Sequence, residues 1–204
     1  MRQLCLPRWL SWFLNMNCLV HVMVAAAFAL PAVSQTTNPK PPTGGNNHTV
    51  ILESDGGSFA IEGPKNWIAD RKVGHRLGVC CVYYEKGSWD TAETIMYPNI
   101  VTKGPGRATL QELMDSDLAK FRKDNPGMTY VDGDIPFNGR TAKVRYFHGV
   151  NQGSSEAVAY IDEEKIIALV VLSSKTEKEL LKAVPLLAGV LETYRYGVKA
   201  VGAH

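Results

Sequence analysis

The sequence predicts an α+β fold, a single-domain α/β/α sandwich built on a mostly antiparallel central sheet of about six strands. Two segments, 109–125 and the stretch that follows Ser174, have apolar residues at the spacing of amphipathic helices. Two others, 78–85 and 166–172, are almost continuously apolar, which is typical of strands buried on both faces. Short turns join most of the predicted strands, so these should pair antiparallel, with a helix layer on each side of the sheet.

The chain begins with the features of a secretory signal peptide. Residues 1–34 have basic residues near the start, then an apolar run, then small residues before Ser34, so cleavage is predicted between Ser34 and Gln35. The alternative is an uncleaved membrane anchor, although polar residues interrupt that longer span. Either arrangement exports the chain, because its positive charges flank the apolar run on the N-terminal side. The predicted location is periplasmic or secreted, with membrane contact only if the segment stays uncleaved.

Composition limits the rest of the chain to one domain. Residues 35–47 are polar and rich in proline and should form a disordered linker, followed by the domain at 48–198 and a flexible tail at 199–204. Removing the signal peptide takes away two arginines and no acids, so the 22 basic residues fall to 20 and balance the 20 acidic residues. A balanced charge gives no electrostatic reason to expect a nucleic acid partner.

The strands are predicted from short apolar runs between turn residues. In order along the chain they are 49–53, 58–62, 78–85, 94–101, 128–131, 135–137, 140–148, 156–161 and 165–172. Asp55-Gly56-Gly57 and Asn138-Gly139 are typical of hairpin turns. Pro98 interrupts the fourth strand, which indicates an edge or a bulge there. The polar stretch 71–76 is interpreted as a loop.

Two helices have recognisable starts. The helix at 109–125 begins with a capping box formed by Thr109 and Glu112. The last helix should begin at an N-cap of Ser174 and be kinked one turn before Pro185, because proline lacks the N–H that an internal helix position donates.

The spacing of Phe59, Ile61, Pro64 and Trp67, followed by strands, a helix, further strands and a terminal helix, resembles the PsbP-like group. That group includes PsbP of the photosynthetic oxygen-evolving complex, a Ran-binding nuclear import factor and exported bacterial proteins similar to DcrB. The resemblance covers about residues 58 to 196 and implies a binding or accessory domain without a shared catalytic centre. A secretory signal stands where plant PsbP has a plastid transit peptide, and an exported protein cannot meet Ran. No functional residue is therefore transferred.

The sequence has no motif that indicates a catalytic site, a metal site or a cofactor. His48, His75, His148 and His204 have no neighbour at metal-ligand spacing. There is no Gly-x-Ser-x-Gly elbow and no phosphate-binding loop. Asp132-Gly133-Asp134 resembles part of a calcium loop but lacks further acidic ligands, so it is interpreted as a turn. Serine is plentiful, and a triad assembled from distant positions stays open.

Two pairs of side chains are candidates for a partner surface. Trp89 and Tyr97 belong to an aromatic group around the loop after 78–85, where exposed rings can form an interface, although core packing is their commoner role. Lys143 and Arg145 point the same way from one predicted strand and could bind an anion or an acidic partner. A solvated strand face is the simpler interpretation of the second pair.

Cys80 and Cys81 are the candidates for redox or thiol-metal chemistry. Adjacent residues of a strand point to opposite faces, so the two side chains are predicted to face different layers of the sandwich. Their Cα atoms should lie about 3.8 Å apart, below the usual disulfide range of about 4.4–6.8 Å. We therefore predict two reduced, buried thiols that act as small hydrophobic residues.

Together these observations predict an exported, non-catalytic binding or accessory domain. Its partner is an extracytoplasmic protein or a small ligand that the sequence does not identify. The alternative functions are a small extracytoplasmic hydrolase with a dispersed active site and thiol or metal chemistry at the cysteine pair.

Overall fold

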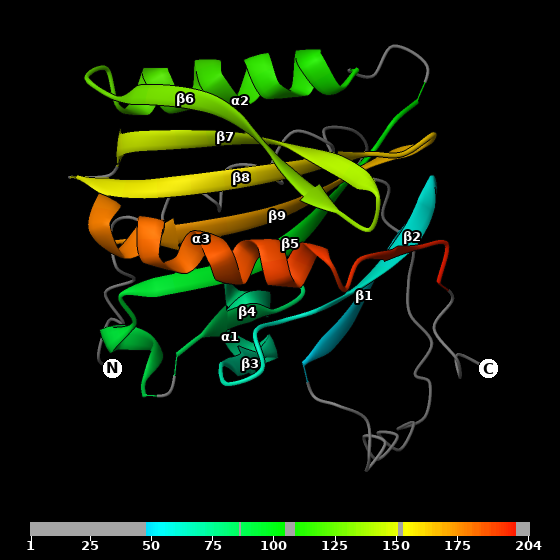
Figure 1. The fold of residues 1–204 in the computed structure, drawn as a ribbon, viewed down its shortest axis with the longest axis horizontal. Coiled ribbons are helices and arrows are strands. Elements are labelled where there is room, and N and C mark those ends of the chain that lie inside the picture. Colours follow the sequence, from blue (N-terminus) through cyan, green and yellow to red (C-terminus); the bar gives the residue numbers. More distant parts are fainter. Residues whose placement is uncertain (1–47, 86, 105–108, 151–152, 199–204) are drawn as a thin grey trace, which may run out of the picture.

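The computed structural model describes residues 48–85, 87–104, 109–150 and 153–198, and the predicted signal peptide, linker and tail lie outside these ranges. The described residues form a seven-stranded sheet and a three-stranded sheet together with helices (Figure 1). Every strand pair among them is antiparallel. The α+β prediction is confirmed, with seven strands in the central sheet where about six were expected.

The central sheet has the order β3-β4-β5-β9-β8-β7-β6. Its strands are β3 (Ile68–Asp70), β4 (Val82–Tyr84), β5 (Thr94–Thr102), β6 (Thr129–Phe137), β7 (Arg140–Val150), β8 (Ser154–Asp162) and β9 (Ile166–Ser174). The small sheet has the order β1-β2-β10, formed by β1 (Thr49–Ser54), β2 (Gly57–Glu62) and β10 (Arg195–Tyr196). The last strand of the domain thus pairs with the second one.

The helices are α1 (Arg71–Arg76), the 3₁₀ turn η3 (Trp89–Thr91), α2 (Leu110–Asp124) and α3 (Glu177–Leu191). The capping box of α2 is present, because the Glu112 N–H donates to Thr109 Oγ1 at 3.3 Å and the Thr109 N–H donates to Glu112 Oε2 at 2.7 Å. The N-cap of α3 is Thr176 and not Ser174. Ser174 ends β9 instead, where its hydroxyl bonds to Thr94 at 2.9 Å.

The core lies on both faces of the central sheet. Val170 and Leu172 of β9 pack in a cluster with α3, and Leu169 and Val171 pack in a cluster with α2. Figure 1 shows α3 in front of β9 and β5 and α2 next to β6. All nine residues of β9 are buried, which confirms the central strand predicted from its unbroken apolar run.

The region around the cysteines differs from the prediction. The strand expected at 78–85 is confined to β4, and α1 replaces the loop expected before it. Asp70 starts α1, because its Oδ1 accepts the N–H of Val73 at 2.8 Å. Residues 77–80 form a turn and a bend and Cys81 follows directly before β4, so the cysteine pair does not lie in a strand.

The strands β6 and β5 test the turns and the sheet edge that the sequence predicts. Asp132-Gly133-Asp134 is part of the continuous strand β6, where a turn was expected. The predicted hairpin turn follows that strand, with a φ of 45° at Asn138 and 70° at Gly139. β4 pairs with β5 only as far as Met96, whereas β9 pairs with β5 along its whole length. Pro98 therefore lies where one side of β5 has no partner strand in this sheet, as the predicted edge requires.

Candidate functional site

A groove lies between the turn that follows β2 and the outer face of α3. Its volume is about 490 Å³. One wall is the turn Gly63–Trp67, and the other wall includes Pro185, Leu186 and Gly189 of α3. We call it the turn–α3 groove.

The turn is fixed by close packing at Gly63. The Gly63 N–H donates to the carbonyl of His48 at 2.9 Å, and the hydroxyl of Tyr83 donates to the same carbonyl at 2.8 Å. A Cβ at Gly63 would lie 2.2 Å from the Tyr83 ring, so only glycine fits without displacing a buried aromatic residue. The Trp67 N–H closes the turn on the Pro64 carbonyl at 3.1 Å. Trp67 is 6% exposed and gives the groove a rigid apolar base.

The helical wall of the groove presents apolar residues to solvent. Pro185, Leu186 and Gly189 are all exposed, and Leu181 one turn earlier is 58% exposed. Pro185 has no N–H to donate to the carbonyl of Leu181. A Cβ at Gly189 would meet no atom within 4 Å, so the space above this position is open.

Polar and charged residues also line the groove. They are Glu62, Lys65, Asn66 and Glu85. The Thr193 hydroxyl is used within the fold, since it donates to the Val190 carbonyl at 2.7 Å and accepts the N–H of Glu62 at 2.8 Å. No histidine, cysteine or serine is among the lining residues that the structure describes. An apolar base with a few polar groups around it is suited to binding.

The two residue pairs predicted as candidates for a partner surface do not form exposed patches. Tyr97 is 3% exposed in the α2-side core, and Trp89 is half-buried on η3. Lys143 lies at the surface, where it pairs with Asp134 at 2.9 Å. Arg145 is 3% exposed, so the solvated strand face expected there is wrong.

Arg145 is buried because α2 covers its strand face. Its Nε and Nη2 donate to the carboxylate of Asp132 at 2.6 and 2.9 Å, and its Nη1 donates to the carbonyl of Met114 at 2.7 Å. The hydrogen bonds from Arg145 lower the pKa of Asp132 below its ordinary value. Asp132 and Asp134 are each paired with a cation of β7, so they do not form an available calcium site.

Cys80 and Cys81 are free thiols between α1 and β4. Cys81 is buried as predicted, whereas Cys80 is only half-buried. Both pack against the cluster on the α3 side, so the prediction that they face different layers is wrong. The alternation of a strand does not apply to residues in a bend. Burial raises the pKa of each thiol to about 11. Thiols with so little thiolate are poor nucleophiles, which supports their interpretation as packing residues.

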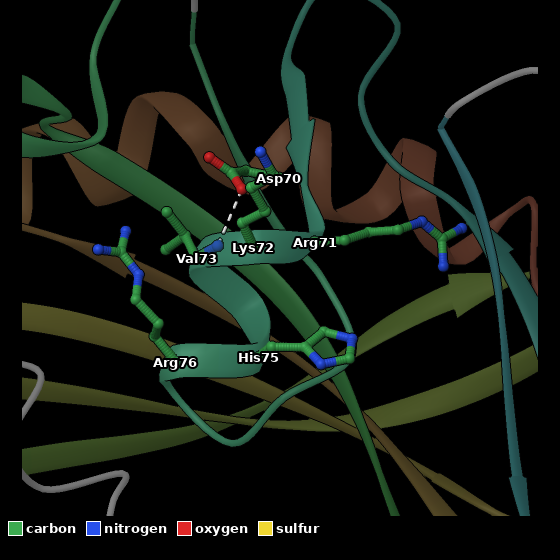
Figure 2. A pocket seen from close by; sticks show the side chains of 6 residues that line it. All are labelled: Asp70, Arg71, Lys72, Val73, His75 and Arg76. Carbon is green, nitrogen blue, oxygen red and sulfur yellow. Dashed lines mark hydrogen bonds between the residues drawn. The ribbon is translucent and has the colours of Figure 1, made fainter. Parts of the chain in front are cut away.

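A second hollow lies against α1 (Figure 2). Its lining residues are Asp70, Arg71, Lys72, Val73, His75 and Arg76. The carboxylate of Asp70 is already bonded to the Val73 N–H and to the hydroxyl of Tyr84. Figure 2 shows Arg71 and His75 extending to one side of α1 and Arg76 to the other. The basic side chains therefore do not converge on one ligand, and we assign no site there.

A polar row crosses the sheet on its α3 side. His148 pairs with Ser155 across β7 and β8, and Ser174 pairs with both Ser155 and Thr94. The Nδ1 of His148 lies 3.6 Å from the Oε1 of Glu177 at the start of α3. Ser155 is 1% exposed, and the Ser174 hydroxyl bonds to Thr94. Serines buried in this way are closed to substrate, so the row does not favour the hydrolase alternative.

The described ranges contain no gathering of three or more histidine, cysteine or acidic side chains that could hold a metal ion. In the same ranges, no helix has the length and apolar character needed to cross a membrane.

The turn–α3 groove was missed at the level of sequence. The sequence prediction gives Pro185 only the role of a kink and gives Gly189 no role. Residues four apart share one face of a helix, so the combination of Pro185 and Gly189 was a visible signal. The turn that completes the groove is far away in the sequence and is brought there by the fold.

Comparisons with known proteins give likenesses of fold alone. No family model and no curated protein matches the chain. LpqN of Mycobacterium tuberculosis, described as involved in cell envelope biogenesis, has a TM-score of 0.49 and 12% identity, covering 74% of this chain and 91% of that chain. Cyanobacterial PsbP (CyanoP) from Synechocystis sp. PCC 6803 has a TM-score of 0.46 and 14% identity, covering 77% of this chain and 97% of that chain. PA94 of Pseudomonas aeruginosa, a protein of unknown function, has a TM-score of 0.43 and 14% identity, covering 72% and 95%. Scores this low carry no argument about function, and membership in the PsbP-like group stays a prediction.

Proposed function

We propose that this chain is an exported, non-catalytic binding or accessory domain whose turn–α3 groove receives an apolar part of its partner. The observation that carries the proposal is the placement of Pro185 and Gly189 on the exposed face of α3. Inside a helix, proline costs about 3 kcal/mol and glycine about 1 kcal/mol relative to alanine. Pro185 is exposed and the Cβ position of Gly189 is empty, so neither residue is required by packing. Residues that weaken an element without a packing reason are expected at functional sites.

The dimensions and surroundings of the groove support a protein partner. Its volume of about 490 Å³ lies within the range of about 300–1,000 Å³ that is usual for binding sites. Leu186, in the groove wall, is 39% exposed, and the apolar surface continues past the groove from Pro185 to Leu181, one turn earlier on α3, which is 58% exposed. A small molecule would leave this extension uncovered, whereas a segment of a protein could bury both leucines.

Two parts of the proposal rest on sequence. Export is supported by the signal-peptide features of residues 1–34, which lie outside the described residues. Membership in the PsbP-like group is supported by the spacing of Phe59, Ile61, Pro64 and Trp67. The first two of these are fully buried in β2, and the last two belong to the wall of the groove.

Filling the groove at Gly189 tests the proposal. Gly189→Phe places a ring in open space and should reduce partner capture at least tenfold without unfolding the domain. Gly189→Ala is the matched control, because a methyl group leaves the groove open and should stabilise α3 by about 0.5–1 kcal/mol. The mature wild-type protein and both variants are used to capture proteins from the envelope fraction of the cells that produce it, with thermal unfolding measured in parallel.

A protein captured by the wild type and by Gly189→Ala, and lost with folded Gly189→Phe, supports the proposal. Equal capture by all three proteins shows that the groove is not the binding surface. Repeated recovery of background proteins alone contradicts the binding function.

A further inference from the structure

Glu156 is a buried acid that the proposed function does not use. It lies on β8 and is 0% exposed. Its neighbour Ala157 belongs to the α3-side cluster, so the side chain of Glu156 faces α2. Its cross-strand neighbours are Phe147 on β7 and Ser173 on β9.

The carboxyl group of Glu156 has one hydrogen bond and no counter-charge. The hydroxyl of Ser173 donates to Oε1 at 3.2 Å, whereas Oε2 is buried without a hydrogen-bond partner. No ion pair among the described residues includes Glu156. Surroundings of this kind tolerate a protonated carboxyl group and strongly disfavour a carboxylate.

The ionisable groups around it do not supply the missing charge. β5 contributes Tyr97, whose pKa is raised by burial and by Glu156 itself. α2 contributes Asp117, which is also acidic, and Lys120, whose Nζ lies 3.6 Å from Asp117. The hydroxyl of Tyr160, on β8 itself, donates to Asp117 at 3.1 Å. The lysine thus balances the other acid.

α2 covers the strand face that holds Glu156. Phe121 of α2 stacks on Phe147, the cross-strand neighbour of Glu156, with ring centres 4.0 Å apart and an interplanar angle of 17°. Arg145, on the same face of β7, does not pair with Glu156, because it donates its hydrogen bonds to Asp132 and to a backbone carbonyl of α2. The strands of the sheet share backbone hydrogen bonds, whereas α2 is attached through side chains. Movement of α2 is therefore the easiest way to admit water to Glu156.

We propose that Glu156 makes the docking of α2 on the sheet depend on pH, with α2 closed while Glu156 is protonated and able to open once Glu156 ionises. Opening lets water reach the carboxylate, which removes the penalty of a buried charge. The hydrogen bond from Ser173 is available to both protonation states, so the change in solvation of Glu156 controls the equilibrium.

The pH range follows from the buried position. Burial raises the pKa of Glu156 from 4.5 to about 7. With α2 open, Glu156 ionises from about pH 4.5, so the closed form is fully favoured below that pH and loses its advantage as pH rises to about 7. Above that pH both forms are ionised and the equilibrium is constant. Between pH 5 and pH 8 the opening equilibrium should increase on the order of fiftyfold.

Hydrogen exchange of the mature protein tests this. Exchange of α2 and α3 amides is measured by mass spectrometry at pH 5 and pH 8 and corrected for intrinsic rates. The expected result is an increase on the order of fiftyfold in the opening of α2 at pH 8, with little change in α3. Glu156→Gln, which cannot ionise, should abolish the increase. Glu164→Gln, which changes an exposed glutamate near the end of β8, should behave as the wild type.

Equal α2 opening at both pH values in the wild type overturns the proposal, and so does an increase that persists in Glu156→Gln. If Glu156→Gln fails to fold, the wild type alone decides through infrared spectroscopy. A protonated carboxyl band should be present at pH 6 and lost by pH 8.5 together with the change in α2 exchange, and absence of the band at pH 6 overturns the proposal.

Discussion

Gly63 shows how one residue can determine the shape of the turn–α3 groove. Gly63→Ala should destabilise the domain by about 1–3 kcal/mol, because the new Cβ would lie 2.2 Å from the Tyr83 ring. The ring is held by its hydrogen bond to the His48 carbonyl and cannot move away freely. Urea unfolding measures the change. Gly127→Ala is the control, since a Cβ there meets no atom within 4 Å, and its unfolding midpoint should stay close to that of the wild type. Similar midpoints for the two variants would show that the turn adapts.

Asp132 illustrates how the strength of an ion pair depends on the burial of one partner, because the Asp132 side chain is 51% exposed and that of Arg145 is 3% exposed. Asp132→Asn should destabilise the domain by about 1–3 kcal/mol, because Arg145 is 3% exposed and would keep its charge with a weaker partner. Asp134→Asn is the matched control. Its pair with Lys143 has side chains 52% and 54% exposed, so its loss should cost less than about 1 kcal/mol.

Asp132→Asn should also change how the stability of the domain depends on pH. The folded-state pKa of Asp132 is lowered, so its stabilising contribution is present above the unfolded value of 3.8 and is lost as pH falls below it. Asp132→Asn should therefore reduce the loss of stability on acidification. Urea unfolding midpoints at pH 7 and pH 3 check this, and an unchanged acid dependence would contradict the assignment.

At the scale of elements, a substitution in α3 is expected to stabilise the domain, whereas most substitutions destabilise a protein. Pro185→Ala restores an N–H for the carbonyl of Leu181 and should stabilise the domain by about 1–3 kcal/mol. The repaired helix should also weaken partner capture, because the exposed face of α3 changes shape. Thermal unfolding and the capture assay measure the two effects. Lys182→Ala, an exposed change on the same helix, should alter capture little. Stabilisation with unchanged capture would separate Pro185 from the binding surface.

The elements that sequence could predict are those with local signals. The capping box of α2, the Asn138-Gly139 turn and the buried strand β9 each depend on neighbouring residues alone. α1 was missed because its local signal is limited to the cap at Asp70. It is stabilised by packing, since a Cβ at Gly74 would lie 2.7 Å from the Cα of Cys81. An apolar run predicts burial, and a buried bend has the same composition as a buried strand.

The candidate site was less predictable than the fold. The turn–α3 groove is lined by residues from two distant parts of the chain, and no local sequence pattern predicts that they lie close together. Pro185 and Gly189 were visible as anomalies, but their neighbours are set by tertiary structure. Glu156 lay inside a predicted strand, where only the fold shows that α2 covers it.

At the scale of the whole molecule, Tyr194 connects the small sheet to the rest of the domain. Its ring lies 5.3 Å from that of Phe59 on β2 and 6.0 Å from that of Phe137 on β6. Tyr194→Ala should destabilise the domain by about 3–5 kcal/mol, because this side chain is 5% exposed. Tyr196→Ala, which removes a ring that is 40% exposed, should cost less than about 1 kcal/mol. Chemical unfolding compares them, and equal effects would show that the end of the chain is not integrated into the core.

The central position of β9 in the sheet has a consequence for how the chain folds. β9 is the ninth of the ten strands that the described residues form, yet it lies between β5 and β8 at the middle of the sheet. The strands made before it cannot join into one sheet until residues 166–174 have been synthesised. Contacts between distant parts of a chain also form slowly. A stable sheet therefore requires residues 166–174, and a chain truncated before β9 should have no stable core.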